Sequence, residues 1–373
     1  SLSLSLSKMA TAVPLVSQLS PETPLHAPKL TSLKSLAESG ALTSIPSNYA
    51  YSTNPNELAG SDPEDTIPVI DFSVLTSGDP DQRSKIIQDL GKACEEWGFF
   101  MVINHGVPES LIKAVIDGCL EFFNLTEEEK REFEQKHVTD PIRCGTSFNP
   151  KLDKVFFWSD FLKVIVHPEF HFPYKPTGFS EIAFEYCKKT REVARELLKG
   201  ILKSLGLEEC HTEKTLNLDS GLQVFAANLY PPCPQPELAM GLPPHTDHGL
   251  LTLLTQNEIG GLQLQHNGKW VNVNALPNSF LINTGDHLEI LSNGKYKSVW
   301  HRAVVNNKAT RISIVTVNGP SLDTVVRPAM ELVISESHPP AYIPMTYKEY
   351  RELQQTNQLD GKSFLDRVRI QIV

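Results

Sequence analysis

The sequence predicts a protein of mixed α and β class in which amphipathic helices precede a sandwich or barrel of short strands. Two observations support this prediction. Between residues 80 and 205, apolar side chains recur at the spacing of one helix face. From Gly221 onwards the pattern changes to short apolar segments separated by turns, among them Asn267-Gly268, a dipeptide typical of tight β-hairpins. A chain of 373 residues with 40% hydrophobic side chains is long enough to bury a large core.

The predicted elements follow one another in a simple order. In the first half, Asp79-Pro80 is typical of a helix start, and Thr126 with Glu129 forms a capping box. Residues 137–178 contain five prolines and are expected to be irregular, and a long irregular stretch in a compact enzyme is often functional. The expected helices are 80–97, 108–122, 180–205 and 346–355, and the expected strands are 67–72, 99–103, 222–230, 250–255, 262–266, 270–273, 280–284, 296–304 and 312–317.

Composition and charge argue against several classes of function. The formal net charge is −10 and basic residues form no long run, so neither nucleic acid nor an anionic membrane surface is an expected partner. No apolar segment approaches the length that a membrane span needs. The six cysteines include no C-x-x-C pair, which favours free thiols in a reducing compartment. We therefore expect a cytoplasmic protein, acting as a monomer on a small molecule.

A candidate metal site lies in the second half of the chain. His245 and Asp247 are two residues apart, and on a strand such residues point to the same side. His301 offers a third ligand. An H-x-D triplet alone is common by chance, and a single histidine is more often structural. Together, two imidazoles and one carboxylate suit a non-haem Fe(II) site with open positions.

A second pattern ten residues after His301 strengthens this interpretation. Arg311 and Ser313 share one face of a predicted strand, where a guanidinium and a hydroxyl can hold a carboxylate. Metal ligands and carboxylate clamp in this order form a joint signal that is stronger than either part.

These residues resemble the plant 2-oxoglutarate- and Fe(II)-dependent dioxygenases, a family with the isopenicillin N synthase-like fold. The segments 67–72, 97–107 and 228–236 are similar to further signatures of that family, and the resemblance covers roughly residues 65 to 355. Segments 146–149, 158–162 and 298–304 lean towards the branch that oxidises flavanones or salicylate. The resemblance implies a double-stranded β-helix, or jelly-roll, core with supporting N-terminal helices and a C-terminal helix.

The resemblance also implies the chemistry and the remaining site residues. Fe(II) is bound by His245, Asp247 and His301, and O2 and 2-oxoglutarate are co-substrates, with ascorbate as reductant. The distal carboxylate of 2-oxoglutarate lies against Arg311 and Ser313, with Tyr230 and Asn228 as further contacts. The substrate pocket includes Phe148, Ala226, Val317 and Gly319.

The resemblance divides the chain into four regions. Residues 1–60 are an N-terminal extension, partly disordered, and residues 61–215 a helical dioxygenase region. Residues 216–321 form the β-helix core that binds Fe(II) and 2-oxoglutarate, and residues 322–373 a tail and helix that cover the pocket. In this pattern Asp286, His287 and Glu289 lie in a supporting turn and strand, and His248 has a role beside the metal ligands rather than as one of them.

The pocket predicts the class of substrate. Ala226, Val317 and Gly319 are small and uncharged, so we expect a largely apolar substrate such as a flavonoid, phenolic, terpenoid or alkaloid, hydroxylated or desaturated with release of succinate and CO2. A phenylalanine at Gly319 is expected to block bulky substrates. Two alternatives remain: an Fe(II) oxidase of the same fold that does not use 2-oxoglutarate, and a non-catalytic barrel that binds a small molecule.

Overall fold

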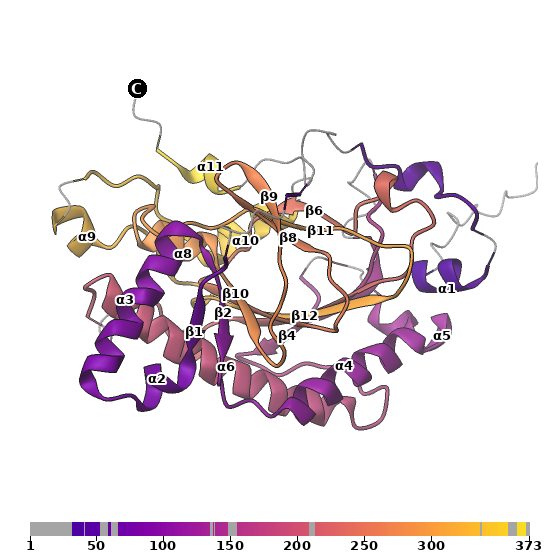
Figure 1. Cartoon of the computed structure of the whole chain (residues 1–373), viewed down its shortest axis with the longest axis horizontal. Helices are drawn as coiled ribbons and strands as arrows, with labels where there is room; N and C mark the ends of the chain where they lie inside the picture. The colour runs from indigo at the N-terminus through magenta and orange to yellow at the C-terminus, as the bar shows by residue number, and fades with distance from the viewer. Residues whose placement is uncertain are drawn as a thin grey trace, which may run out of the picture. The chain divides into compact units, whose positions relative to one another are not determined.

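The fold is built on two β-sheets that face each other, with helices on the outer side of the larger sheet (Figure 1). The structure is a computed structural model that describes residues 32–40, 42–52, 59–60, 66–134, 137, 139–147, 155–208, 213–335, 338–356 and 364–370. All of these residues belong to one unit, which spans Thr31–Val373. Phe148 and most of the expected N-terminal extension lie outside the described residues.

The described residues form eight strands in the larger sheet and four in the smaller one. The larger sheet has the order β1 (Val69–Asp71), β2 (Phe99–Ile103), β10 (Phe280–Thr284), β7 (Leu251–Gln256), β12 (Arg311–Asn318), β5 (Gln223–Tyr230), β4 (Asp160–His167) and β3 (Ile142–Thr146). The smaller sheet has the order β6 (Leu242–His245), β11 (His301–Ala303), β8 (Leu262–His266) and β9 (Lys269–Asn272). β1 and β2 are parallel, and the other neighbouring pairs in both sheets are antiparallel. The mixed α and β class is therefore confirmed.

The two faces of the larger sheet bury different cores, because successive side chains on a strand point to opposite faces. Phe225 and Ile282 lie on the outer face and pack among the helices. Leu254 and Leu281, which are register partners, pack with Leu264 of the smaller sheet. We call the face of the larger sheet that carries Leu254 and Leu281 the inner face.

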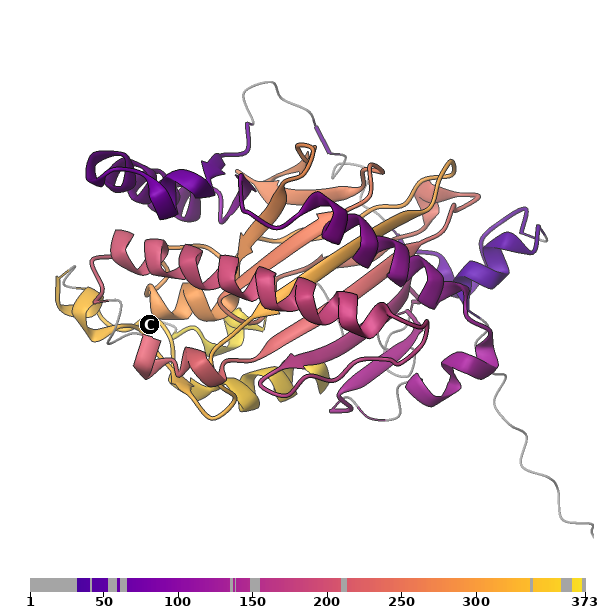
Figure 2. The same cartoon turned by 90° about the horizontal axis from the view of Figure 1, so that it is seen from below.

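Amphipathic helices cover the outer face, as predicted. They are α2 (Phe72–Ser77), α3 (Pro80–Glu96), α4 (Glu109–Asn124) and α6 (Phe179–Ser204), and Figure 2 shows α6 running across the strands. Asp79 and Gln82 form a reciprocal capping box at the start of α3, and Thr126 and Glu129 form the predicted one at α5 (Glu127–Lys130). No helix in the described part of the chain is both long and apolar enough to span a membrane.

Three predicted elements were wrong. Residues 137–178 are not irregular throughout, because β3 and β4 lie between the prolines rather than on them. Asp286, His287 and Glu289 lie in a helix, α8 (Asp286–Leu291), all of whose side chains are buried, so no polar face reveals its period. The strand predicted at 296–304 is limited to β11, His301–Ala303.

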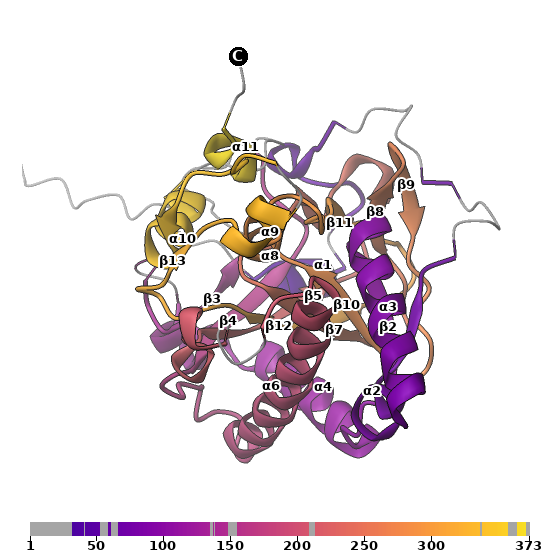
Figure 3. The same ribbon diagram turned by 90° about the vertical axis from the view of Figure 1, so that its left-hand side faces the viewer.

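The segments near both ends of the described chain pack on the sheets. At the C-terminal end, α9 (Met330–Ser335), α10 (Tyr347–Thr356) and α11 (Leu365–Val368) gather beside α8 (Figure 3), and Tyr350 and Leu365 pack against Ile290 of α8. A short two-stranded sheet of β13 (Val325–Val326) and β14 (Met345–Thr346) precedes α10. At the other end, α1 (Leu33–Glu38) and η1 (Ser47–Tyr49) lie near β4, where the Asp160 carboxylate accepts hydrogen bonds from the backbone of Leu33 and from Lys34 N–H.

Candidate metal centre and carboxylate clamp

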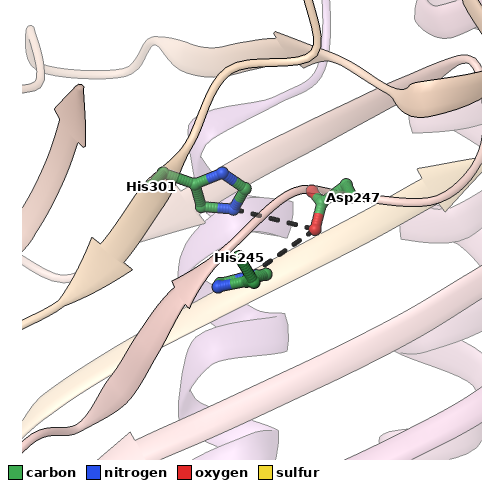
Figure 4. Close-up of side chains that lie close together, drawn as sticks. All are labelled: His245, Asp247 and His301. Atoms are coloured by element: carbon green, nitrogen blue, oxygen red, sulfur yellow. Dashed lines mark ion pairs between the residues drawn. The ribbon is translucent and has the colours of Figure 1, made fainter. Parts of the chain in front are cut away.

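The three predicted metal ligands lie together between the two sheets. His245 ends β6 and His301 begins β11, and these two residues are register partners. The Nε2 atoms of His245 and His301 lie 3.6 and 3.7 Å from Oδ1 of Asp247 (Figure 4). One ligand atom from each of the three residues lies within 4.8 Å of the others. Asp247 follows the end of β6 rather than continuing it, so a turn as well as the strand places its carboxylate.

Hydrogen bonds orient each of the three side chains. Nδ1 of His245 donates to the Pro243 carbonyl at 2.8 Å, and Nδ1 of His301 donates to the Val299 carbonyl at 3.1 Å. Because carbonyl oxygens only accept, both rings carry their proton on Nδ1 and turn an Nε2 lone pair towards the centre. The amide of Asn283 donates to Oδ2 of Asp247 at 2.9 Å, which leaves Oδ1 turned towards the imidazoles.

The charge states of these groups suit a cation. Burial and the neighbouring His301 lower the pKa of His245 to about 4, so its ring is neutral at physiological pH. Burial alone would raise the pKa of Asp247, but His301, His245 and the amide of Asn283 hold it below the usual range. The site therefore offers neutral imidazole nitrogen and ionised carboxylate oxygen.

The predicted carboxylate clamp lies on the inner face of the larger sheet. Arg311 is the register partner of Tyr230, and Ser313 is the partner of Asn228. The Arg311 side chain is 1% exposed, and its guanidinium lies 5.0 Å from the centre of the Tyr230 ring. Its Nη2 donates to Oε1 of Gln256 at 2.8 Å. Nε and Nη1 of Arg311 are buried without a hydrogen-bond partner among the described residues, which is a costly state for a guanidinium unless an anion binds there.

The predicted pocket residues that the structure describes are all on the inner face or at its edge. Ala226 is the register partner of Val315, and Val317 packs in a cluster with Val224 and Tyr347. Gly319 follows β12, and a Cβ atom placed on it would lie 2.5 Å from the hydroxyl oxygen of Tyr347. The space beside Gly319 is therefore already filled by α10, and a phenylalanine there would displace Tyr347 before it blocked a substrate.

Other polar side chains support the site without a local sequence signal. Asn283 contacts Asp247, and Gln256 contacts Arg311. Both contacts depend on strand register and not on a local sequence motif. His248 is not among the groups that could hold a metal ion in the described residues; its Nδ1 forms a 2.6 Å hydrogen bond with the hydroxyl of Tyr347. Tyr347 thus joins α10 to the turn that carries Asp247.

Comparisons with known proteins agree with this geometry. Residues 221–320 match the model of the 2OG-Fe(II) oxygenase superfamily, and residues 67–182 match that of the non-haem dioxygenase in morphine synthesis N-terminal region. The chain is 46% identical to 2-oxoglutarate-dependent dioxygenase 19 of Oryza sativa subsp. japonica, over 87% of this chain and 97% of the relative. It is 40% identical to flavanone 3-dioxygenase 2 of the same plant, over 81% and 87%.

One solved structure is similar to this chain in both fold and sequence. The crystal structure of JOX2 in complex with 2OG, Fe and JA has a TM-score of 0.81 and 31% sequence identity, and the match covers 92% of this chain and 98% of that one. Sequence, fold and site therefore agree, and the chain belongs to the 2OG-Fe(II) oxygenase superfamily, as an Fe(II)- and 2-oxoglutarate-dependent dioxygenase.

Proposed function

We propose that this dioxygenase hydroxylates or desaturates a small, largely apolar plant metabolite of the flavonoid, phenolic, terpenoid or alkaloid type. The observation that carries the proposal is the pairing of a His-Asp-His ligand set with a buried guanidinium that has unsatisfied donors. Among the relatives are a flavanone 3-dioxygenase and a thebaine 6-O-demethylase, which supports the class of substrate.

The donor set fits Fe(II). Two imidazole nitrogens and one carboxylate are the ligands of many non-haem iron oxygenases, and carbonyl groups already fix both imidazole tautomers. Fe(II) bound by His245, Asp247 and His301 supplies the oxidising chemistry, by which one O2 and one 2-oxoglutarate give succinate, CO2 and an oxidised substrate. Ascorbate is the expected reductant for iron that oxidises without turnover.

The chain's own residues position the reactants. Arg311 provides two free donors in a planar fork, and Ser313 a hydroxyl beside them, for the distal carboxylate of 2-oxoglutarate. Tyr230 and Asn228 are the cross-strand partners of these two residues and complete the clamp. The buried side chains of Ala226 and Val317 help to exclude water from the substrate side.

The finer features of the fold fit the same proposal. Two facing, largely antiparallel sheets with the metal ligands between them are what a jelly-roll, or double-stranded β-helix, requires. We infer that residues 216–321 form this core, that 61–215 support it, and that 322–373 cover the pocket. The five cysteines described are buried free thiols, which supports a reducing compartment such as the cytoplasm. A monomer is expected, and size-exclusion chromatography tests it.

Succinate release tests the reaction. We expect a member of a panel of plant phenolics and terpenoids to stimulate succinate release by the iron-loaded protein. Asp247→Ala should lose iron and turnover while circular dichroism still reports the folded sheets. Full activity in that variant would exclude Asp247 as a ligand.

Arg311 tests the use of 2-oxoglutarate. Loss of a buried, charge-assisted contact costs about 2–5 kcal/mol, so Arg311→Ala should raise the apparent KM for 2-oxoglutarate strongly. Arg311→Lys keeps the positive charge but loses the planar fork of donors. Its apparent KM for 2-oxoglutarate should lie between those of the wild type and of Arg311→Ala. Unchanged turnover without any 2-oxo acid would instead favour an oxidase that does not use 2-oxoglutarate.

A further inference from the structure

A buried carboxylate on β4 caps a helix that is distant in the sequence. Asp160, the first residue of β4, is 4% exposed. Its carboxylate accepts hydrogen bonds from the N–H groups of Leu33 at 3.0 Å and Lys34 at 2.9 Å, in the first turn of α1. The hydroxyls of Ser32 and Thr146 donate to the same carboxylate. Because the first N–H groups of a helix lack intrahelical partners and favour a negative charge, Asp160 fixes the start of α1.

The residues after this cap pack against the end of the larger sheet. We call the described residues between 32 and 51 the N-terminal strap. The strap and the sheet share a buried apolar cluster of Leu33, Tyr49, Trp158, Cys233 and Ala239, against which Leu36, Leu42, Ile45, Phe156 and Val305 pack. The Tyr49 ring meets the Trp158 ring edge-on, with 5.3 Å between their centres. Near the far end of the strap, Tyr51 N–H donates to the Leu238 carbonyl at 2.8 Å. The strap is therefore held at both ends and along its apolar side.

Two members of this cluster lie in the turns that adjoin the clamp strands. Cys233 follows β5, whose last residue is Tyr230. Val305 lies between β11 and β12, and Arg311 is the first residue of β12. The N–H of Cys233 donates to the carbonyl of Asn306 at 2.8 Å, which joins the two turns to each other. The strap thus packs against both chain segments from which the clamp side chains extend.

Trp158 connects the strap to the clamp most directly. Its indole Nε1 donates to the carbonyl of Pro231 at 3.1 Å, and Pro231 is bonded to Tyr230. Trp158 lies two residues before Asp160, which is the register partner of Leu229. Leu229 directly precedes Tyr230. The cap and the tryptophan therefore lie at the level of the sheet where the clamp begins.

The clamp depends on accurate placement of these strand ends. The Arg311 guanidinium lies 5.0 Å from the centre of the Tyr230 ring, and its Nε and Nη1 have no hydrogen-bond partner among the described residues. A bidentate contact requires the planar fork to face its carboxylate, so a small shift of either strand end weakens the contact. Asp160 itself turns away from the clamp, because its partner Leu229 packs among the helices on the outer face.

We propose that Asp160 is a positioning residue for 2-oxoglutarate. By capping α1, it holds the N-terminal strap against the two turns that place Tyr230 and Arg311. The inference rests on the proposed function, in which these two side chains contact the distal carboxylate of 2-oxoglutarate. It assigns the strap a part in co-substrate binding, although the strap lies on the side of the sheet away from the clamp.

Binding of 2-oxoglutarate tests the proposal without turnover. 2-Oxoglutarate is titrated calorimetrically into the full-length, Fe(II)-loaded protein in the absence of oxygen. We expect Asp160→Ala to weaken binding about tenfold, the lower end of the loss seen when a supporting partner is removed at a metal site. Fe(II) affinity, measured by competition with a chelator, should change less, because Asn283 and the backbone of α8 hold Asp247.

Three further variants separate positioning from general stability. Ser32→Ala removes one of the four hydrogen bonds to the cap and should have a smaller effect in the same direction. Trp158→Phe keeps an aromatic ring in the cluster but loses the donor to the Pro231 carbonyl, so it should also weaken 2-oxoglutarate binding. Asp79→Ala is the control: Asp79 caps α3 by accepting from Gln82 N–H at 2.9 Å. This control should lower Tm and leave 2-oxoglutarate affinity unchanged.

Hydrogen exchange shows whether the effect reaches the clamp. In Asp160→Ala, exchange should accelerate in the strap and also in residues 229–233 and 305–311, while β7 and β10 keep their protection. Wild-type affinity for 2-oxoglutarate in both Asp160→Ala and Trp158→Phe would make the strap purely structural and overturn the proposal, whatever their Tm. An equal loss of affinity in Asp79→Ala would overturn it as well. If Asp160→Ala does not fold, Trp158→Phe and Ser32→Ala decide the question by the same measurement.

Arg311→Ala distinguishes failure of this inference from failure of the proposed function. Weaker 2-oxoglutarate binding in Arg311→Ala, together with wild-type binding in the strap variants, contradicts the inference alone. Wild-type binding in Arg311→Ala contradicts the clamp itself, and the inference fails with it.

Discussion

Each histidine of the metal site donates its Nδ1 proton to the carbonyl two residues before it. The Pro243 carbonyl accepts from His245 and the Val299 carbonyl accepts from His301. The same local hydrogen bond thus orients both histidines, which are register partners on neighbouring strands. A histidine held in this way keeps its Nε2 lone pair aimed at one point and loses little rotational freedom when a metal binds. Backbone carbonyls thus orient the two imidazole rings, while the side chain of Asn283 orients the Asp247 carboxylate.

Asn283 should therefore affect metal affinity more than stability. Its amide donates to Oδ2 of Asp247, and loss of such a partner typically weakens metal binding about 10- to 100-fold. We expect Asn283→Ala to lower Fe(II) affinity within that range, measured by competition with a chelator. Asn318→Ala is the matched control: Asn318 is equally buried in the same sheet, but it donates to the carbonyls of Leu251 and Thr316. Equal affinity losses in both variants would contradict a specific role for Asn283.

His105 provides a test of pH dependence at the residue scale. It is 4% exposed; its Nδ1 accepts from Val107 N–H, so its Nε2 donates to the Asn278 carbonyl. Burial lowers the pKa of His105 below its usual value, so the unfolded chain binds this proton more readily than the folded one. Stability from this group is present above about pH 6.5 and is lost as the pH falls below it.

The matching variant isolates that contribution. His105→Gln keeps one acceptor and one donor but does not titrate, so its free energy of unfolding should fall less between pH 7.5 and 5.5 than that of the wild type. Denaturant unfolding at the two pH values measures the difference. Because the other buried histidines are present in both proteins, an identical fall in both would show that His105 does not contribute.

At the scale of elements, α10 closes one end of the inner face. Tyr347 packs against Gly319 at the end of β12 and is hydrogen-bonded to His248. A side chain at position 319 has no space, because even a Cβ atom would lie 2.5 Å from the tyrosine hydroxyl. Glycine at this position is therefore needed for close approach of the helix.

Gly319→Ala should destabilise the fold by about 1–3 kcal/mol, the usual effect of overpacking. Gly260→Ala is the control, since no atom lies within 4 Å of a Cβ placed there. Replacing Tyr347 by alanine should remove most of the penalty at position 319, so a double-mutant cycle should show strong coupling. A neutral Gly319→Ala variant would mean that α10 does not pack there in solution.

The elements also show what the sequence could predict. Strands β8 and β10 were predicted to the residue, because turns bound their apolar runs. His245, Asp247 and Arg311 could be proposed from sequence because H-x-D and R-x-S are short local patterns, although a turn beyond β6 places Asp247 rather than the strand that was predicted. Asn283 and Gln256 were missed, because their contacts depend on the register of β10 and β7 with their neighbours, which is a property of the tertiary fold. The helix α8 was missed for a local reason: it is buried on every side.

At the scale of the whole molecule, α8 joins the metal turn to the C-terminal segment. Its first residues donate backbone hydrogen bonds to the carbonyls of Asp247 and Gly249. Further along it, the carboxylate of Glu289 is 3% exposed and accepts from the backbone of Ser298, the hydroxyl of Tyr342 and the guanidinium of Arg369. One buried carboxylate thus holds the segment that carries α10 against the loop that leads to His301.

Glu289→Ala should loosen the C-terminal segment before it unfolds the sheets. The variant leaves the buried Ser298 N–H and the Tyr342 hydroxyl without their acceptor, at roughly 1–3 kcal/mol each, whereas Arg369 is 47% exposed on its side chain and can be hydrated. Native-state hydrogen exchange should therefore accelerate in residues 341–354 and 364–370 while the central strands β5, β7 and β12 keep their protection. Glu331→Ala, which changes an exposed carboxylate on α9, should leave exchange in both places unchanged. Uniform acceleration of exchange across the whole chain would instead make Glu289 a general stabiliser of the fold, without a distinct part in holding the C-terminal segment.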